Sequence, residues 1–404
     1  MYFVDLFVPF NFNFYSSLLL PPFFQGVIFV VLLLQRFYRE NRKSDIWLAG
    51  ILGILTIRIA FWMLGYAGWY DKHNAYTTFM FYFPFNNLIA TGTLLYFYFL
   101  SVTNVQFQLK KEHYKHFILP ILWILMIILK FVVDFIYYYP FPKIEELQYG
   151  TKGYWAELDK SVVANTISYI TFFYYVYLTL KKYKAYEVYI LENFSSTEKI
   201  DFVWLRNLLY AVFAVGMVAF VFFIVSIFFV KLSYSQDWVA YLILGILIYY
   251  ISIYGYYTDK PYKLHFEEEK NTQVEEKSLE KVQPQDIVEL EAWRVKVEKY
   301  ILEYQPYLNP ELTLSELSKA LSTNTSYLSR VINDRFEQNF NDFINAYRIQ
   351  EFVKKINKGQ HKTETLLSVA YDCGFNSKAT FNRAFKKIHA QTPVEYIRSM
   401  SVIL

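Results

Sequence analysis

The chain has 404 residues, of which 55% are hydrophobic, 21% aromatic and only 19% charged, and its formal net charge is +4. A length of this order suggests two or three domains. The apolar excess lies in residues 18–257, whereas residues 258–404 have the composition of an ordinary soluble protein, so the two parts require different solvents. The single cysteine, Cys373, excludes an internal disulfide and fits a reducing compartment for the part that carries it.

The N-terminus does not have the pattern of a cleaved signal peptide. Residues 1–17 contain no basic run and include Asp5, and apolar sequence continues far beyond them. We expect this segment to be retained.

Seven apolar segments have the length that a bilayer requires, which is about twenty helical residues. They are residues 18–38, 46–66, 78–101, 116–138, 161–182, 204–230 and 237–257. A large soluble α protein could also bury such helices, but it rarely does so without giving them polar faces. The pattern therefore predicts a seven-helix transmembrane domain over residues 1–257.

Lysine and arginine are unevenly distributed among the loops of this domain. The first, third and fifth loops with their flanks carry twelve of these residues, and the intervening loops carry five. The positive-inside rule places the richer side in the cytoplasm. We expect a multi-pass protein of the inner (cytoplasmic) membrane, with its N-terminus outside and everything after residue 257 in the cytoplasm.

A few polar residues fall near the middle of the apolar segments. Arg58 lies in the second segment, Asn86 and Asn87 in the third, and Lys130 and Asp134 in the fourth, where their i, i+4 spacing puts them on one helix face. Charges at this depth usually face the bundle interior and find a partner. These residues predict either a pocket that senses a ligand, ion or proton, or a purely structural polar clamp.

The apolar part contains no pattern that indicates catalysis. HExxH, glycine-rich phosphate-loop and GxSxG motifs are absent, and its histidines lack acidic neighbours at metal-ligand spacing. We therefore expect neither an enzyme nor a metal or cofactor site.

Residues 258–285 are charged, contain two prolines and predict a solvated linker. From residue 286 apolar residues return at helical spacing, which predicts an amphipathic connecting helix over 286–305. This helix could support the next domain, or it could form a dimer contact or transmit a signal. We define 306–404 as the last domain.

Two helix-turn-helix patterns follow. In the first, a helix from Leu314 or Ser315 to Leu321 precedes a turn, Asn324 is a suitable N-cap, and a second helix begins at Thr325. Its apolar stripe leaves four polar residues toward solvent, which suit base edges and phosphates. They are Ser326, Tyr327, Arg330 and Asn333.

The second pattern follows a long amphipathic helix that begins near Phe340. Residues 366–375 supply a supporting helix and a glycine turn, and a basic helix begins at Ser377. Phe381, Ala384 and Phe385 form its inner stripe. The candidate DNA-binding residues of this unit are Ser377, Lys378, Asn382, Arg383 and Lys386.

Residues from about 306 to 398 resemble the DNA-binding domain of the AraC/XylS family of bacterial transcription regulators. The resemblance lies in SYLSRVIN (326–333), FNDFINAYRI (340–349), AYDCGFNSKATFNRAFKK (370–387) and TPVEYIR (392–398). It implies seven helices in two helix-turn-helix units joined by a long helix, with both recognition helices in successive major-groove segments. The whole chain resembles membrane-bound members of that family, in which a multi-helix membrane domain replaces the soluble sensor.

The chain departs from the family pattern in the supporting helix of the first unit and at several turns. Ser318 replaces the usual alanine, Ser322 and Glu337 stand where glycine is common in the first unit, and Ala390 does so in the second. Ser322 and Glu337 would need left-handed or altered turn geometry, at some cost in free energy.

The sequence as a whole predicts an all-α protein, a transmembrane bundle followed by a cytoplasmic tandem helix-turn-helix domain, that senses a signal and regulates transcription. Its expected partners are double-stranded DNA, the lipid bilayer and an unknown small-molecule or membrane signal. A second copy of the chain and RNA polymerase are further candidates. The alternative is a membrane receptor or transporter whose tail is a protein-interaction module, and proteolytic release of the tail is a third hypothesis.

Overall fold

The computed structural model describes residues 11–71, 75–85, 87–104, 106–137, 153–156, 158, 161–198, 200–230, 234–258, 266 and 284–403. They form helices and no strand, which confirms the all-α prediction. The chain divides into two compact units. The first, here called the apolar unit, comprises Met1–Tyr183 and Val203–His265, and the second, the C-terminal unit, comprises Lys184–Phe202 and Phe266–Leu404. The sequence did not predict that residues 184–202 would join the C-terminal unit.

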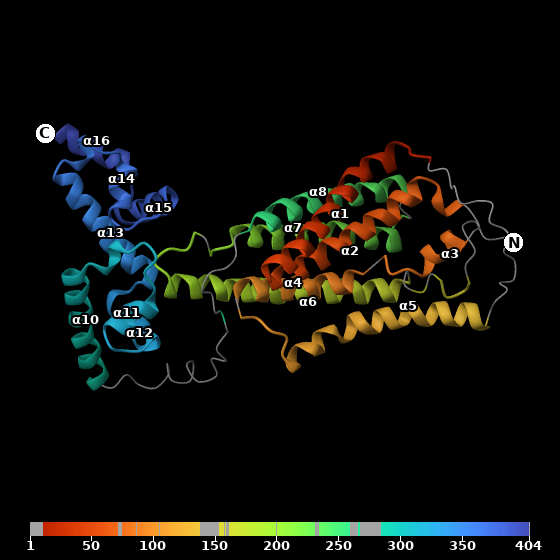
Figure 1. Cartoon of the computed structure of the whole chain (residues 1–404), viewed down its shortest axis with the longest axis horizontal. Helices are drawn as coiled ribbons and strands as arrows, with labels where there is room; N and C mark the ends of the chain where they lie inside the picture. The colour runs from red at the N-terminus through yellow and green to blue at the C-terminus, as the bar shows by residue number, and fades with distance from the viewer. Residues whose placement is uncertain are drawn as a thin grey trace. The chain divides into compact units, whose positions relative to one another are not determined.

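The apolar unit is a set of helices that run alongside one another (Figure 1). They are α1 (Phe14–Glu40), α2 (Lys43–Tyr66), α3 (Ala75–Tyr82), α4 (Leu88–Thr103), α5 (Ile118–Tyr137), α7 (Val203–Phe228) and α8 (Tyr234–Tyr257), together with most of α6 (Val162–Asn193). Short 3₁₀ helices occur at Trp69–Asp71 and Lys111–Phe117. Close approach of α1 to α2 depends on Gly26, because a Cβ there would lie 2.0 Å from Oγ1 of Thr56.

Five helical stretches among the described residues are long and apolar enough to cross a membrane. They are Phe14–Glu40, Lys43–Tyr66, Lys111–Tyr137, Val203–Phe228 and Ser235–Tyr257. The shorter α4 is also apolar, and α6 has 32 residues but a more polar sequence. The prediction of several membrane-length helices is confirmed, and the count of seven spans stays a prediction.

The prediction of one continuous segment over 78–101 is wrong, because the chain breaks between α3 and α4. Pro84 lacks a backbone N–H and disfavours helical geometry in the residue before it. The side chain of Asn87 then accepts a hydrogen bond from the backbone N–H of Ala90 and begins α4. Asn86 lies outside the described residues, as does almost all of the predicted linker.

Helix α5 buries its charged residues and exposes apolar ones, the reverse of a helix on the surface of a soluble protein. Its buried residues, Pro120, Trp123, Ile127, Lys130 and Asp134, follow a single helical stripe that includes both of its charges. Its exposed residues are large and aliphatic, such as Leu122, Leu125 and Leu129. A buried stripe that holds both charges, with an apolar exterior, suits a helix that faces lipid.

The C-terminal unit consists of α10 (Pro284–Tyr304), α11 (Leu314–Ala320), α12 (Thr325–Phe336), α13 (Phe340–Asn357), α14 (Leu366–Tyr371), α15 (Lys378–His389) and α16 (Pro393–Ile403), with 3₁₀ turns at Pro306–Leu308 and Gln360–Lys362. The long helix α13 serves two cores. Its first half, with Phe340 and Phe343, packs with α10, α11 and α12. Its second half, with Phe352 and Ile356, packs with α14, α15 and α16.

Candidate nucleic-acid interface and intramembrane cavity

The first helix-turn-helix unit is formed by α11 and α12. Thr313 and Glu316 form a reciprocal capping box at the start of α11, and the Asn324 side chain caps α12 by accepting from the backbone N–H of Tyr327 at 2.7 Å. The expected apolar stripe is buried: Leu317, Leu321, Leu328, Val331 and Ile332. The sequence therefore predicted both helices and the face that each of them buries.

The four candidate DNA contacts of α12 differ in their surroundings. Ser326 and Asn333 are exposed. Arg330 is exposed but its Nε lies 3.4 Å from Oδ2 of Asp334, one turn away. Tyr327 is half-buried: its hydroxyl donates to Oε1 of Glu289 at 3.0 Å and its ring packs edge-on against Trp293, both on α10. Helix α10 therefore covers part of the face that the sequence assigned to DNA.

The second unit is formed by α14 and α15. Gly374, with φ +91°, makes the turn between them, and a Cβ at this position would lie 2.2 Å from the carbonyl oxygen of Tyr307. The Ser377 hydroxyl oxygen caps α15 by accepting from the backbone N–H of Thr380 at 3.1 Å. Phe381, Ala384 and Phe385 are buried as expected. Only glycine fits this turn.

The charged residues that helix α15 exposes are all basic. Lys378, Arg383 and Lys386 are exposed and Asn382 is half-buried. The helix contains no acidic residue, and Nζ of Lys387 is held 2.6 Å from Oδ2 of Asp342 on α13. Ser377 also donates to the Glu198 carboxylate, from the loop between α6 and α7.

Sequence reasoning missed the most buried cation of the C-terminal unit, Arg348 on α13. Its guanidinium donates to backbone carbonyls of Tyr307 (2.8 Å), Asn309 (2.8 Å) and Ser195 (3.1 Å), and to the Ser195 hydroxyl (3.0 Å). Burial lowers the pKa of Arg348 to about 10, so it stays charged at neutral pH. Its position, four residues from Ile344 and from Phe352, was the signal that it lies on the buried face.

The turn positions that lack glycine behave as their sequence indicated. Ser322 and Glu337 have φ of 55°, and Ala390 has φ of 56°. All three therefore adopt left-handed geometry, which costs an L-residue about 1–2 kcal/mol. The fold of both units is preserved at that cost.

Comparisons with known proteins agree with this geometry. A family model described as a helix-turn-helix domain matches residues 317–399, a span that begins within α11 and extends into α16. The C-terminal domain is an AraC-type helix-turn-helix domain. Uncharacterized HTH-type transcriptional regulators of Staphylococcus aureus, from strains COL and MSSA476, are each 32% identical to this chain over 90 residues. These residues make up 22% of this chain and only 12% of each relative.

No solved structure shows a significant match to the chain. The relatives are described as HTH-type transcriptional regulators, and the stretch that they share with this chain is a small part of their own length.

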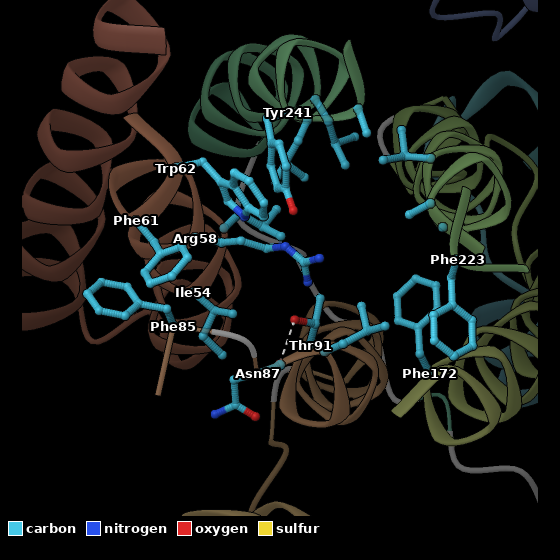
Figure 2. A pocket seen from close by; sticks show the side chains of 18 of the residues that line it. Ile54, Arg58, Phe61, Trp62, Phe85, Asn87, Thr91, Phe172, Phe223 and Tyr241 are labelled. Carbon is cyan, nitrogen blue, oxygen red and sulfur yellow. Dashed lines mark hydrogen bonds between the residues drawn. The ribbon is translucent and has the colours of Figure 1, made fainter. Parts of the chain in front are cut away.

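The apolar unit contains a cavity of about 370 Å³. Figure 2 shows the Arg58 guanidinium among the lining side chains, between the Tyr241 hydroxyl and Thr91. The Arg58 Cζ lies 5.9 Å from the centre of the Tyr241 ring. The walls are mainly apolar and aromatic, and Phe172 and Phe223 line the side opposite Arg58. The cavity also includes Asn87 and Asp237.

The structure separates the predicted intramembrane polar residues into two groups. Arg58 and Asn87 line the cavity. Lys130 and Asp134 are instead buried beside α3: the Lys130 ammonium donates to the carbonyls of Phe81 (3.1 Å) and Ala156 (2.9 Å), and Asp134 accepts from the Tyr82 hydroxyl at 2.7 Å. These bonds fit the clamp hypothesis for Lys130 and Asp134, and the cavity fits the pocket hypothesis for Arg58. The Asn87 side chain caps α4 and points away from the cavity in Figure 2.

Another buried pair was not expected. Arg36 lies near the end of the first predicted segment, and its Nε and Nη2 contact the Asp45 carboxylate at 2.6 and 2.8 Å, with both side chains buried. The same guanidinium donates to the carbonyl of Tyr256. It therefore ties α1, α2 and α8 together.

Proposed function

We propose that the chain is a membrane-embedded transcription regulator that binds double-stranded DNA through both units of its AraC-type domain. The observation that carries the proposal is the pair of N-capped helices, α12 and α15, each with a buried apolar stripe and an exposed polar face. A recognition helix of this kind lies in the major groove and contacts bases through its N-terminal residues.

The exposed residues of the two helices have different expected roles. Lys378 and Lys386 suit phosphates, whose contacts give affinity that falls with salt. Arg383 and Asn382 on α15, and Arg330 and Asn333 on α12, suit base edges, because a guanidinium can pair with guanine and an amide with adenine. Ser326 and Ser377 suit either a phosphate or a base edge. We expect Tyr327 to contribute less to DNA binding, because α10 covers part of it.

The test is to map the genomic sites that the intact protein occupies, and then to titrate one site with the full chain in lipid nanodiscs. Arg383→Ala should weaken specific binding by about 1–3 kcal/mol and relax the base preference at one position. Arg398→Ala removes a charge from an exposed position on α16 and is the control. If no site is enriched, or if the two variants behave alike, the proposal fails. The absence of any bound site would favour the alternative, a receptor or transporter whose tail binds proteins.

We also propose that the apolar unit spans the inner membrane, with the N-terminus outside and the C-terminal domain in the cytoplasm. The five membrane-length helices and the lysine and arginine excess of one set of loops support it. Labelling cysteines introduced at Ser235 and at Lys110 with a membrane-impermeant maleimide tests this topology. Ser235→Cys should react from outside in intact cells, and Lys110→Cys only after lysis; the opposite pattern would contradict it.

The signal is proposed to bind in the cavity that contains Arg58. Apolar and aromatic walls with a few polar groups are typical of small-molecule sites, and a charge at membrane depth usually serves a function. A largely apolar molecule with an acidic head group would place its carboxylate at Arg58 and its tail toward Phe172 and Phe223.

Thermal unfolding of the full chain in nanodiscs with decanoate or decanol tests this ligand class. Decanoate should stabilise the wild type more than decanol does, and Arg58→Gln should abolish that preference. Arg39→Gln, a change at an exposed arginine, should retain it. Equal stabilisation of all three proteins by the two compounds would count against an acidic ligand at Arg58.

A further inference from the structure

The loop between α6 and α7 is hydrogen-bonded to the AraC-type domain through residues 194–198. Two parts of this loop contact different regions of the domain. We name them the anchor (Phe194 and Ser195) and the arm (Ser196, Thr197 and Glu198). All of these residues belong to the C-terminal unit.

The anchor is embedded in the domain. The backbone N–H of Ser195 donates to the carbonyl of Leu312 at 3.1 Å, and Ser195 is fully buried. Arg348 donates to both the carbonyl and the hydroxyl of Ser195. The carbonyl of Phe194 accepts from Nδ2 of Asn341 at 3.0 Å. Breaking these contacts would leave a buried guanidinium and a buried amide with fewer partners, which is costly. The anchor is therefore a stable attachment.

The arm extends to the N-terminal end of the second recognition helix. The Ser196 hydroxyl accepts from Nδ2 of Asn376 at 2.7 Å. The Glu198 carboxylate accepts from the hydroxyls of Ser377, which caps α15, and Thr380, the latter at 3.1 Å. These contacts of Ser196 and Glu198 are all polar, and Thr197 between them is buried.

The carboxylate of Glu198 occupies a position that suits a DNA phosphate. The first turn of a helix attracts anions, because its free N–H groups and dipole present positive charge. Serine and threonine hydroxyls are common donors to phosphate oxygens. The N-terminal residues of a recognition helix are also those that must enter the groove. A carboxylate at this end of α15 both occupies the donors and repels the phosphodiester backbone.

We propose that the arm, Ser196–Glu198, is an autoinhibitory element that competes with DNA for the N-terminal end of α15. In the docked state the second unit cannot enter the major groove, while the first unit remains accessible at Ser326, Arg330 and Asn333. Lifting the arm, with the anchor in place, frees Ser377 and Thr380 for the phosphate backbone. The proposal rests on DNA binding by this domain, as proposed above, and adds a control of that binding.

Helices α6 and α7 connect the arm to the cavity of the apolar unit. The loop joins α6 to α7, and these two helices contribute Tyr169, Phe172, Gly216 and Phe223 to the lining of the cavity. A ligand that shifts α6 and α7 relative to each other changes the path of the loop that joins them. To lift the arm, the ligand must bind the protein more tightly when the arm is lifted than when it is docked on α15.

The first experiment compares DNA affinities of the full chain in nanodiscs. The probe is a mixed-sequence duplex about three helical turns long at low salt, where phosphate contacts dominate. Glu198→Gln keeps the shape of the side chain and removes its charge, and it should raise affinity about fivefold or more, as typical couplings do. Glu311→Gln removes the same charge from an exposed position of the same domain, and it should change affinity by less than about twofold. Equal effects of the two variants, or weaker binding by Glu198→Gln, would overturn the proposal.

The second experiment measures docking without relying on affinity. Ser196→Cys/Asn376→Cys, made in the full chain, places two thiols where the arm meets the turn before α15, and a short reversible crosslinker joins them. Cys373 can stay, because it is buried and burial raises the pKa of its thiol to about 12. Saturating duplex DNA should slow crosslinking, the crosslinked protein should lose affinity for DNA, and reduction should restore it. Each single-cysteine variant is the control and should keep its affinity after the same treatment.

The two proposals fail in different ways. Crosslinking that proceeds at the same rate with and without bound DNA means that the arm and DNA are compatible, and it overturns the autoinhibitory arm alone. Absence of DNA binding in the wild type, Glu198→Gln and the reduced double variant contradicts the proposed function, and with it the arm's role.

Discussion

The two helix-turn-helix units of the C-terminal domain are built alike but are covered differently. Helices α12 and α15 each follow a short supporting helix, begin at a side-chain cap (Asn324 and Ser377) and bury an apolar stripe. Over α12 lies the helix α10, which contacts Tyr327 through Trp293 and Glu289. Over the start of α15 lies the arm, whose Ser196 and Glu198 are hydrogen-bonded to Asn376, Ser377 and Thr380.

The difference shows which cover can be removed. Helix α10 buries Leu290, Val297 and Ile301 in the core of the first unit, and burial of each such side chain contributes roughly 1.5–3 kcal/mol. The neutral bond between Asn376 and Ser196 contributes about 0.5–1.5 kcal/mol net and each bond to the Glu198 carboxylate about 1.5–3 kcal/mol, and a phosphate oxygen is an acceptor of the same kind. The cover of the first unit is therefore part of its apolar core, whereas the proposed exchange at the second unit replaces one anionic acceptor by another.

The strongest test of this comparison removes the second unit alone. Gly374→Ala should cost about 3 kcal/mol or more, because it adds backbone overlap at Tyr307 to the strain of a positive φ. Hydrogen exchange of the full chain should show lost protection in α14 and α15 but not in α11 and α12. Gly359→Ala is the matched control, since Gly359 has φ +86° but nothing within 4 Å of an added Cβ. Similar losses in the two variants would mean that strain, not the clash, decides the effect.

The next largest effect concerns helix α10, whose apolar side chains cover the first unit. Leu290→Ala should destabilise α11 and α12 by about 2–4 kcal/mol, because it leaves a cavity in their core. Val288→Ala, on the same helix at a side chain that is 72% exposed, should have almost no effect. Hydrogen exchange in α11 and α12 measures both. A loss for Leu290→Ala as small as for Val288→Ala would show that α10 is not a structural part of this unit.

The DNA contacts of the two helices should also be unequal. Arg383 is exposed on a helix without acidic residues, and Arg383→Ala is expected to cost about 1–3 kcal/mol of specific binding. Arg330 must first leave Asp334, 3.4 Å away, so Arg330→Ala should cost less than about 1 kcal/mol. Fluorescence anisotropy with one mapped genomic site gives both values. If Asp334→Ala does not raise the contribution of Arg330, the ion pair is not the reason for the difference.

Much of the C-terminal domain could be predicted from the sequence, because its signals are local. The cap at Asn324, the turn at Gly374 and the apolar stripe of α15 each depend on residues within a few positions of one another. Even the left-handed geometry of Ser322 and Glu337 followed from the residue types that usually occupy those turns.

The contacts that control the site could not be predicted in this way. Ser195 and Arg348 are hydrogen-bonded although 153 residues separate them, and Glu198 reaches Ser377 across 179 residues. No periodic pattern in the sequence indicates such a pairing between distant residues. In the apolar unit, the depth of Arg58 and Lys130 was readable from segment length, but only the fold separates the cavity of Arg58 from the buried site of Lys130.

The smallest expected effect concerns the turn that ends α15. Ala390 has φ of 56°, a geometry that costs an L-residue about 1–2 kcal/mol, and glycine would recover that energy less about 0.4–1 kcal/mol for its more flexible unfolded state. Ala390→Gly should therefore stabilise the second unit by up to about 1 kcal/mol, seen as slower hydrogen exchange in α15. Ala379→Gly makes the same change at an exposed position inside α15 and should destabilise it by about 1 kcal/mol. Because the two variants share their chemistry, opposite signs would attribute the effect to backbone geometry, and equal signs would mean that Ala390 is not strained.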